Sequence, residues 1–229
     1  MKKLLKNKIN IEFFIVLAVA FLWNNFVYWG AKVLTQHRFH YDITSFIDEM
    51  IPFLPWTVSI YFGCYVFWFA NYCLCATWEK SERNRFFCAD FMAKGICFLI
   101  FILIPTTNVR PEITETGIWG FLMNFLYTVD SADNLFPSIH CLASWLCWIG
   151  VRKNKSVSKA YSYISLFISI TICISTLTTR QHVIIDVIGG VLLAELCYFI
   201  AGYPKVSHLY SKAISKIRSL FPSKQKSDR

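Results

Sequence analysis

Long apolar runs alternate with short polar segments along almost the whole chain. A helix rises about 1.5 Å per residue, so one bilayer crossing needs roughly 20 residues. The pattern predicts six membrane-spanning helices, at residues 11–34, 55–78, 87–104, 137–151, 160–177 and 183–203. We therefore expect one all-α transmembrane bundle over residues 1–203, followed by a tail over residues 204–229.

Two further segments carry apolar residues but are not predicted to span the membrane. Residues 116–129 are about 14 residues long and include Asn124 and two glycines, which favours an interfacial or re-entrant helix. In the tail, apolar residues recur every three or four positions between Lys212, Lys216 and Arg218. This spacing predicts a basic amphipathic helix that lies on anionic lipid.

The composition agrees with a membrane protein. Of the 229 residues 55% are hydrophobic and 16% are charged, with mean hydropathy +0.45, whereas soluble domains have roughly 25% charged residues. A disordered chain, a coiled coil and a secreted disulfide scaffold are excluded. The nine cysteines lie mostly inside apolar runs, so we expect free thiols that behave as small hydrophobic groups.

The net charge of +9 is distributed in short clusters between the apolar runs, which indicates topology and not a nucleic-acid partner. If the N-terminus is inside, 18 of the 23 Lys and Arg residues fall on the inner side and only four on the outer side, and the remaining one, Lys94, lies within the third predicted helix. We therefore expect a multi-pass protein of the plasma membrane with both termini cytoplasmic. The oligomeric state is not encoded in any of these patterns.

Two histidines lie at the outer ends of predicted helices. His182 precedes Asp186 by four residues, a spacing that brings an imidazole and a carboxylate about one helical turn apart. A carboxylate that holds the Nδ1 proton leaves the Nε2 lone pair free for attack or for accepting a proton. The alternative is a polar pair that only stabilises the helix.

His140 ends the sequence Pro137-Ser138-Ile139-His140 at the start of the fourth predicted helix. Free N–H groups at a helix N-terminus bind anions, although the same residues also occur as an ordinary cap. Arg110 and Arg180 fall on the same outer face, against the general bias of positive charge towards the inside. Two arginines beside two histidines favour an anionic substrate such as a phosphate.

Three motifs in this order resemble the signature of the type 2 phosphatidic acid phosphatase superfamily. They are Arg110-Pro111, Pro137-Ser138-Ile139-His140, and the segment from Thr179 to Asp186. The resemblance implies a six-helix core with an active site at the outer face and a metal-independent reaction through a phosphohistidine. It implies no cofactor, and a membrane lipid phosphate as substrate.

The resemblance also implies a role for each matching residue. His182 would be the nucleophile, Asp186 its orienting partner, and His140 the acid that protonates the leaving oxygen. Arg110, Arg180 and Ser138 would bind the phosphate. The expected activity is hydrolysis of phosphatidate, phosphatidylglycerophosphate or a polyprenyl diphosphate on the extracytoplasmic side.

Two positions depart from the family pattern. Leu103 stands where the family has a lysine, and Arg180 precedes His182 by two residues where six are usual. The shortened third motif resembles the branch that includes sphingolipid head-group synthases, which implies an alternative activity: transfer of a phosphoryl-linked group to an alcohol.

Other functions are less favoured by the residues. His140 and His182 as haem ligands would define an electron-transfer protein, and a transporter with a phosphate-lipid site would be expected to show inverted repeats, which we do not detect. His37 and His40 are more typical of an exposed loop than of a metal site. Glu195 and the Asp90/Lys94 pair are expected either to have internal partners or to extend their charged ends to the membrane surface.

Overall fold

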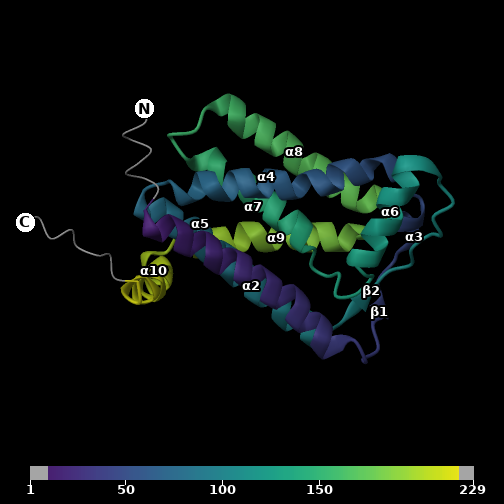
Figure 1. Ribbon diagram of the computed structural model, residues 1–229, viewed down its shortest axis with the longest axis horizontal. Helices are drawn as coiled ribbons and strands as arrows, with labels where there is room; N and C mark the ends of the chain where they lie inside the picture. The colour runs from purple at the N-terminus through teal and green to yellow at the C-terminus, as the bar shows by residue number, and fades with distance from the viewer. Residues whose placement is uncertain (1–9, 222–229) are drawn as a thin grey trace, which may run out of the picture.

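The computed structural model describes residues 10–221. The basic segment ahead of the first predicted helix and the last tail residues lie outside this range. The all-α prediction is confirmed for the described chain, apart from one short strand pair (Figure 1). The elements are α2 (Ile11–Thr35), β1 (Tyr41–Asp42), α3 (Phe46–Glu49), the 3-10 turn η1 (Pro55–Thr57), α4 (Val58–Ala76), α5 (Lys80–Leu103), β2 (Thr106–Thr107), α6 (Gly117–Val129), α7 (Ile139–Lys153), α8 (Lys159–Thr178), α9 (Ile184–Ile200) and α10 (Pro204–Ser219).

Several of these helices are compatible with a multi-pass membrane protein. Four are long and apolar enough to cross a bilayer, namely α2, η1 with α4, α5 and α8. The bent pair α9 and α10 passes the same test only when taken together, and α6 and α7 are shorter apolar helices. Each of the six predicted runs thus contains a helix, while the count of six crossings stays a prediction.

The third predicted helix starts earlier than the apolar pattern indicated. We expected residues 79–87 to be a polar inner segment, but α5 already begins at Lys80. The buried guanidinium of Arg83 contacts the Glu12 carboxylate of α2 at 2.5 Å, and Arg85 donates to the Tyr198 carbonyl. These polar partners extend the helix beyond its apolar part, which hydropathy alone does not reveal.

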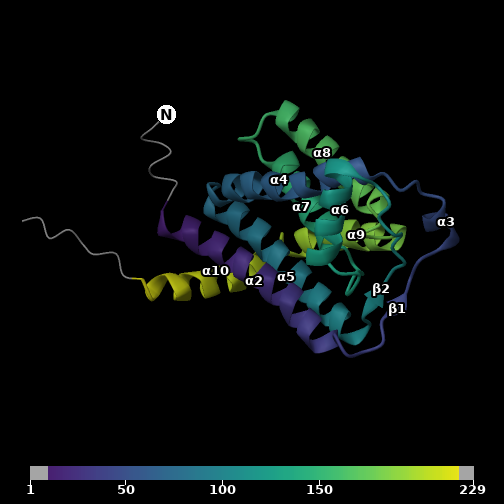
Figure 2. The same ribbon diagram turned by 45° about the vertical axis from the view of Figure 1, so that its right-hand side comes forward.

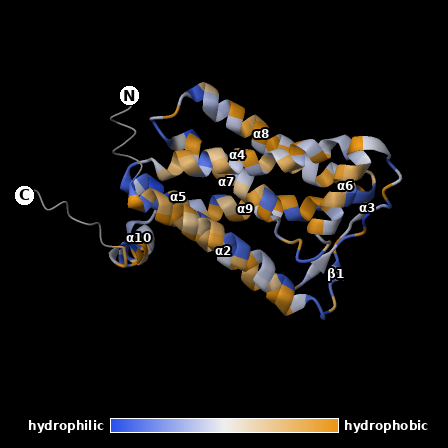
Figure 3. Ribbon diagram, in the orientation of Figure 1, coloured by the Kyte–Doolittle hydropathy of each residue, from blue (hydrophilic) through white to orange (hydrophobic). Residues whose placement is uncertain are grey.

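The helix α7 is the centre of the bundle. It packs against α4, α8 and α9, while α5 packs against α2 and α9. Leu142, Leu146 and Ile149 of α7 are completely buried. Apolar residues dominate the long helices, and hydrophilic residues gather at α10 and around β1 and α3 (Figure 3).

The two ends of the bundle differ in structure. The helix α10 and the start of α2 lie at one end, and β1, β2, α3 and α6 lie at the other (Figures 1 and 2). At that second end β1 pairs with β2 in parallel, with Tyr41 opposite Thr106. This pair joins the loop after α2 to the loop after α5, and it was not expected from the sequence.

The tail forms the predicted helix, α10, which is bent by 90° from α9. Its apolar residues divide into two groups: Tyr210 and Ile214 pack against the main core, whereas Leu209 and Leu220 are exposed. One side of α10 is therefore bound to the bundle and another is open to its surroundings.

The polar residues expected to have internal partners do have them. Lys94 Nζ lies 2.8 Å from Asp90 Oδ1 within α5, and Tyr72 donates to the same carboxylate. Glu195 of α9 accepts from Arg152 at 2.8 Å and from the Trp145 ring at 3.0 Å. The buried charges of Asp90 and Lys94 compensate each other, as a low-dielectric environment requires.

Candidate functional site

The connection between α8 and α9 carries His182. Its backbone N–H donates to the Thr176 carbonyl at 3.1 Å, and the N–H of Gln181 donates to the same oxygen at 3.0 Å. His182 Nδ1 lies 3.1 Å from Asp186 Oδ2. The same carboxylate oxygen accepts the Val183 N–H at 3.1 Å, so Asp186 both caps α9 and holds the imidazole.

This geometry differs in one detail from the expected one. The helix α9 begins at Ile184, so His182 precedes the helix and does not share a helical face with Asp186. Burial of His182 lowers the pKa of its imidazole, but the hydrogen bond and charge of Asp186 raise it more, and the net pKa lies above the usual 6.5. With Nδ1–H donated to Asp186, Nε2 is the nitrogen available for chemistry.

His140 lies in the first turn of α7, opposite His182. The centroids of the two imidazole rings are 5.7 Å apart. The N-termini of α7 and α9 approach closely here, since Ser138 N–H donates to the Asp186 carbonyl at 3.1 Å. A Cβ atom on Gly190 would lie 2.6 Å from the Ser138 carbonyl oxygen, so only glycine permits this approach.

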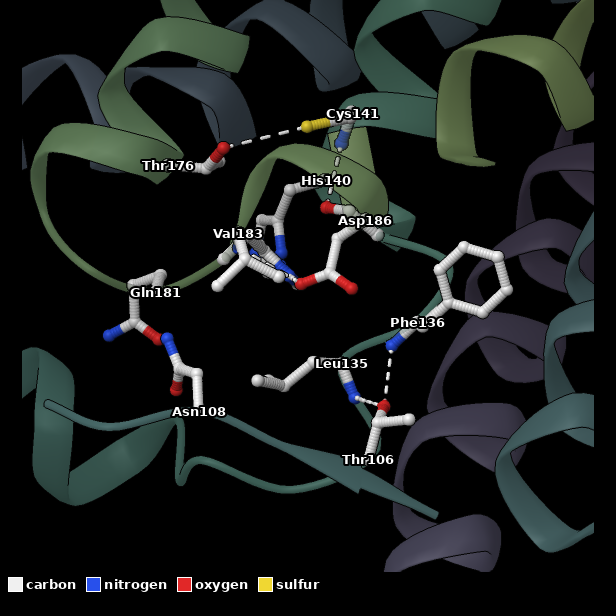
Figure 4. Close-up of polar contacts among 12 residues, drawn as sticks. Thr106, Asn108, Leu135, Phe136, His140, Cys141, Thr176, Gln181, Val183 and Asp186 are labelled. Carbon is white, nitrogen blue, oxygen red and sulfur yellow. Dashed lines mark hydrogen bonds and ion pairs between the residues drawn. The ribbon is translucent and has the colours of Figure 1, made fainter. Parts of the chain in front are cut away.

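Ser138 is the cap of α7. Its Oγ accepts the Cys141 N–H at 3.2 Å, and the residue is completely buried. The segment ahead of it is fixed by β2, because the Thr106 hydroxyl accepts from the N–H groups of Leu135 and Phe136 (Figure 4). The Cys141 thiol reaches Thr176 of α8 at 3.6 Å in the same view. Ser138 therefore positions the helix that carries His140.

Arg110 lies next to the His182 loop. Its guanidinium donates to the side-chain oxygen of Gln181 at 2.5 Å and to the backbone carbonyl of Asp130 at 2.6 Å. It also lies over the ring of Tyr127, 4.7 Å from the centroid. Within the described chain, Arg110 Nε and Gln181 Nε2 are buried N–H donors without a partner, which suits the binding of an anion.

The Arg180 side chain contacts a different segment from Arg110, the loop between α2 and α4. Its backbone has φ = 56°, in the left-handed region. The guanidinium donates to the backbone carbonyls of Asp48, Glu49 and Ile51 in the loop between α2 and α4. Its expected role as a phosphate ligand stays a prediction, and these three carbonyls compete with a phosphate for it.

Asp48 joins this loop between α2 and α4 to α9. Its Oδ1 accepts the Ile184 N–H at 2.7 Å, and its side chain also forms a capping box with Ser45. Burial alone raises the pKa of Asp48, but the hydrogen bonds from Ser45 and Ile184 lower it below the usual 3.8. The loop is thus fastened to the start of α9, two residues after His182.

Sequence reasoning missed a second group around His140. Tyr61 of α4 lies 2.9 Å from His140 Nε2 and donates to Asp130 Oδ2 at 2.6 Å, while Tyr28 of α2 donates to Asp130 Oδ1 at 2.9 Å. Burial alone raises the pKa of Asp130, but the charge of His140 and the Tyr61 hydroxyl lower it below the usual 3.8. An acidic residue directly after the apolar segment 117–129 was the only available sequence signal, and nothing distinguished Tyr61 from the other tyrosines.

The fold and the site define a helical protein, compatible with a multi-pass membrane protein, in which two histidines, one of them held by a carboxylate, lie at one end of the bundle. A family model described as the PAP2 superfamily matches residues 33–200, which is more than half of the chain. The chain belongs to this superfamily, that of the type 2 phosphatidic acid phosphatases. Searches of curated proteins and of solved structures returned no match. Membership supports a phosphatase-type function on lipid phosphates.

Proposed function

We propose that this protein is an integral membrane lipid phosphatase that works through a phosphohistidine on His182. The observation that carries the proposal is the arrangement of the two rings: His182 is oriented by Asp186, and the His140 ring is 5.7 Å away. A phosphoryl group can then contact a nucleophile on one side and an acid on the other.

The proposed reaction has two steps. In the first, His182 Nε2 attacks phosphorus, the bond from phosphorus to the lipid oxygen breaks with its electron pair on oxygen, and His140 protonates that oxygen. In the second, water attacks the phosphohistidine and gives its proton to His140, which releases phosphate and restores both histidines. Asp186 stabilises the positive charge that His182 acquires.

The substrate is proposed to be a lipid phosphate or pyrophosphate, such as phosphatidate, phosphatidylglycerophosphate or a polyprenyl diphosphate. The buried donors of Arg110 and Gln181 support binding of the phosphate oxygens. The distribution of Lys and Arg supports a plasma-membrane protein with both termini cytoplasmic and the site on the extracytoplasmic side.

Phosphate release in detergent with EDTA tests this proposal. We expect the parent protein to release phosphate from at least one of the three lipids, and His182→Ala to release none above background. The matched control is His208→Ala, because His208 is an exposed residue of α10 at the other end of the bundle. A folded parent without activity on all three lipids, or an active His182→Ala protein, contradicts the proposal.

Head-group transfer is the second candidate function, and the short spacing between Arg180 and His182 favours it. In this reaction the phosphoryl-linked group leaves His182 for an alcohol and not for water. Adding a lipid alcohol to the same assay distinguishes the two functions. A new lipid with no free phosphate indicates transfer, whereas free phosphate that is unaffected by the alcohol indicates hydrolysis.

We also propose that α10 lies on anionic lipid, with Leu209 and Leu220 in contact with the membrane. Its exposed apolar residues lie beside Lys205, Lys212 and Lys216 in the sequence, which supports an interfacial helix. Hydrogen exchange of α10 in nanodiscs is expected to be slower with anionic than with zwitterionic lipid. Replacing the three lysines by glutamine should remove this difference; equal exchange in both lipids contradicts the proposal.

A further inference from the structure

Asp130 is a partly buried carboxylate that no sequence motif of the site includes. It follows α6 directly and faces α2 and α4, where both of its oxygens accept hydrogen bonds from tyrosine hydroxyls. Within residues 10–221 its carboxylate forms no ion pair. The nearby Arg110 donates to the backbone carbonyl of Asp130 and not to its carboxylate. A partly buried carboxylate loses part of its hydration, and here two tyrosine hydroxyls compensate that loss.

The Tyr61 hydroxyl lies between the Asp130 carboxylate and the His140 ring. Tyr61 has a single hydroxyl proton, and it donates this proton to Asp130 Oδ2 at 2.6 Å. The Tyr61 oxygen then presents its lone pairs to the His140 ring, 2.9 Å from Nε2 and 3.4 Å from Nδ1. Tyr61 is completely buried and its ring centroid lies 4.7 Å from that of His140, so the three groups form a continuous chain.

We propose that Asp130 is a positioning residue for His140, acting through the Tyr61 hydroxyl. This inference rests on the proposed function, in which His140 protonates the leaving oxygen. The Asp130 charge, one hydroxyl away, stabilises the positive charge that His140 carries as an acid, and the Tyr61 side chain packs against the His140 ring and restricts its position. Tyr28 holds the second Asp130 oxygen and keeps the carboxylate directed at Tyr61.

Other groups around His140 do not supply this charge. The rings of Tyr65 and Trp68 pack near His140, with centroids 6.3 Å and 5.4 Å from its own. They restrict the imidazole without a hydrogen bond to it in the described chain. Asp133, three residues after Asp130, is partly exposed and lies 3.8 Å from Lys32 instead. Asp133 therefore offers a matched control for the loss of one carboxylate.

The test compares two synthetic lipid phosphates of equal chain length. The leaving oxygen of an alkyl ester needs a proton, whereas that of a nitrophenyl ester leaves without one. Single-turnover release of the alcohol or phenol is measured for the parent, Asp130→Asn and Asp133→Asn. We expect Asp130→Asn to slow the alkyl ester at least ~10-fold and the nitrophenyl ester by less than about threefold, since general acid catalysis contributes roughly 10²–10⁴-fold. Asp133→Asn should stay within about twofold of the parent on both esters.

A merely structural role gives a different result. If Asp130→Asn slows both esters equally, or slows neither, the inference is overturned while the His182 reaction of the parent still stands. If the parent itself is inactive, the proposed function fails and the inference fails with it. Tyr61→Phe is the second variant, for use if Asp130→Asn does not fold, and it should show the same dependence on the leaving group.

Discussion

The rings of His140 and His182 lie 5.7 Å apart, centroid to centroid, where the N-termini of α7 and α9 meet. Asp186 contributes to both sides of this meeting point, because its side chain holds His182 and its carbonyl accepts the N–H of Ser138. The orientation of one histidine is thus coupled to the placement of the helix that carries the other.

Replacing Asp186 by asparagine should separate the effect of its negative charge from that of its capping hydrogen bond to α9. The amide oxygen of Asp186→Asn can still accept the Val183 N–H, so we expect α9 and the fold to remain. The amide lacks the negative charge that stabilises protonated His182, so kcat should fall by roughly 10²–10⁴-fold. Phosphate release and thermal unfolding of the same preparation check both statements, and Asp186→Ala, which also loses the cap, should unfold at a lower temperature.

The pH dependence of kcat/KM should report on the same pair. His182 must be neutral to attack phosphorus, and its pKa lies above the usual 6.5 because Asp186 outweighs the opposing effect of burial. Activity should therefore fall as the pH decreases through a value above 6.5. In Asp186→Asn the opposing effect of burial remains without the carboxylate, so the acid limb should move to lower pH. An acid limb that is unchanged by this substitution would contradict the assignment.

Arg180 should act mainly on the loop between α2 and α4. Arg180→Gln removes three hydrogen bonds from a charged donor to the carbonyls of Asp48, Glu49 and Ile51. Because such bonds contribute about 1.5–3 kcal/mol each, we expect at least ~10-fold faster hydrogen exchange of the amides in 45–51. Exchange measured in detergent, with phosphate release in parallel, checks this.

The matched control for that experiment is Arg38→Gln. Arg38 lies in the same loop between α2 and α4, but it donates to the Ile102 carbonyl and should leave exchange of 45–51 unchanged. If Arg180→Gln instead raises KM for the lipid phosphate and leaves exchange unaltered, Arg180 binds substrate, as the family resemblance implies.

Periodicity and short motifs predicted the parts of the site that are close in sequence. The His182–Asp186 contact, the Ser138 cap and the helix after it follow from residues within four positions of one another. Hydropathy also located the helices, because burial in lipid requires long apolar runs. It misplaced the start of α5, where the partner of Arg83 comes from α2.

The parts of the site that could not be predicted depend on contacts between distant segments. Tyr61 and Asp130 meet His140 only because α4 and the end of α6 pack beside α7. The direction of Arg180 depends on a left-handed backbone conformation that arginine rarely adopts. No spacing rule contains this information, since each contact is fixed by tertiary packing.

Glu12 should show how burial decides the strength of an ion pair at the other end of the bundle. Its carboxylate contacts Arg83 and Arg218, both at 2.5 Å. The Arg83 side chain is 6% exposed and that of Arg218 is 55% exposed. Glu12→Gln leaves the Arg83 charge buried without a carboxylate, which should cost about 3–5 kcal/mol of folding stability.

Removing the exposed partner should cost far less. Arg218→Ala leaves the pair of Glu12 with Arg83 intact, and an exposed ion pair contributes only about 0–1 kcal/mol. Thermal unfolding in one detergent should therefore rank the parent and Arg218→Ala close together and Glu12→Gln well below both. Equal losses in the two variants would mean that Glu12 stabilises the bundle mainly by holding α10, and that the buried charge of Arg83 is compensated by other groups.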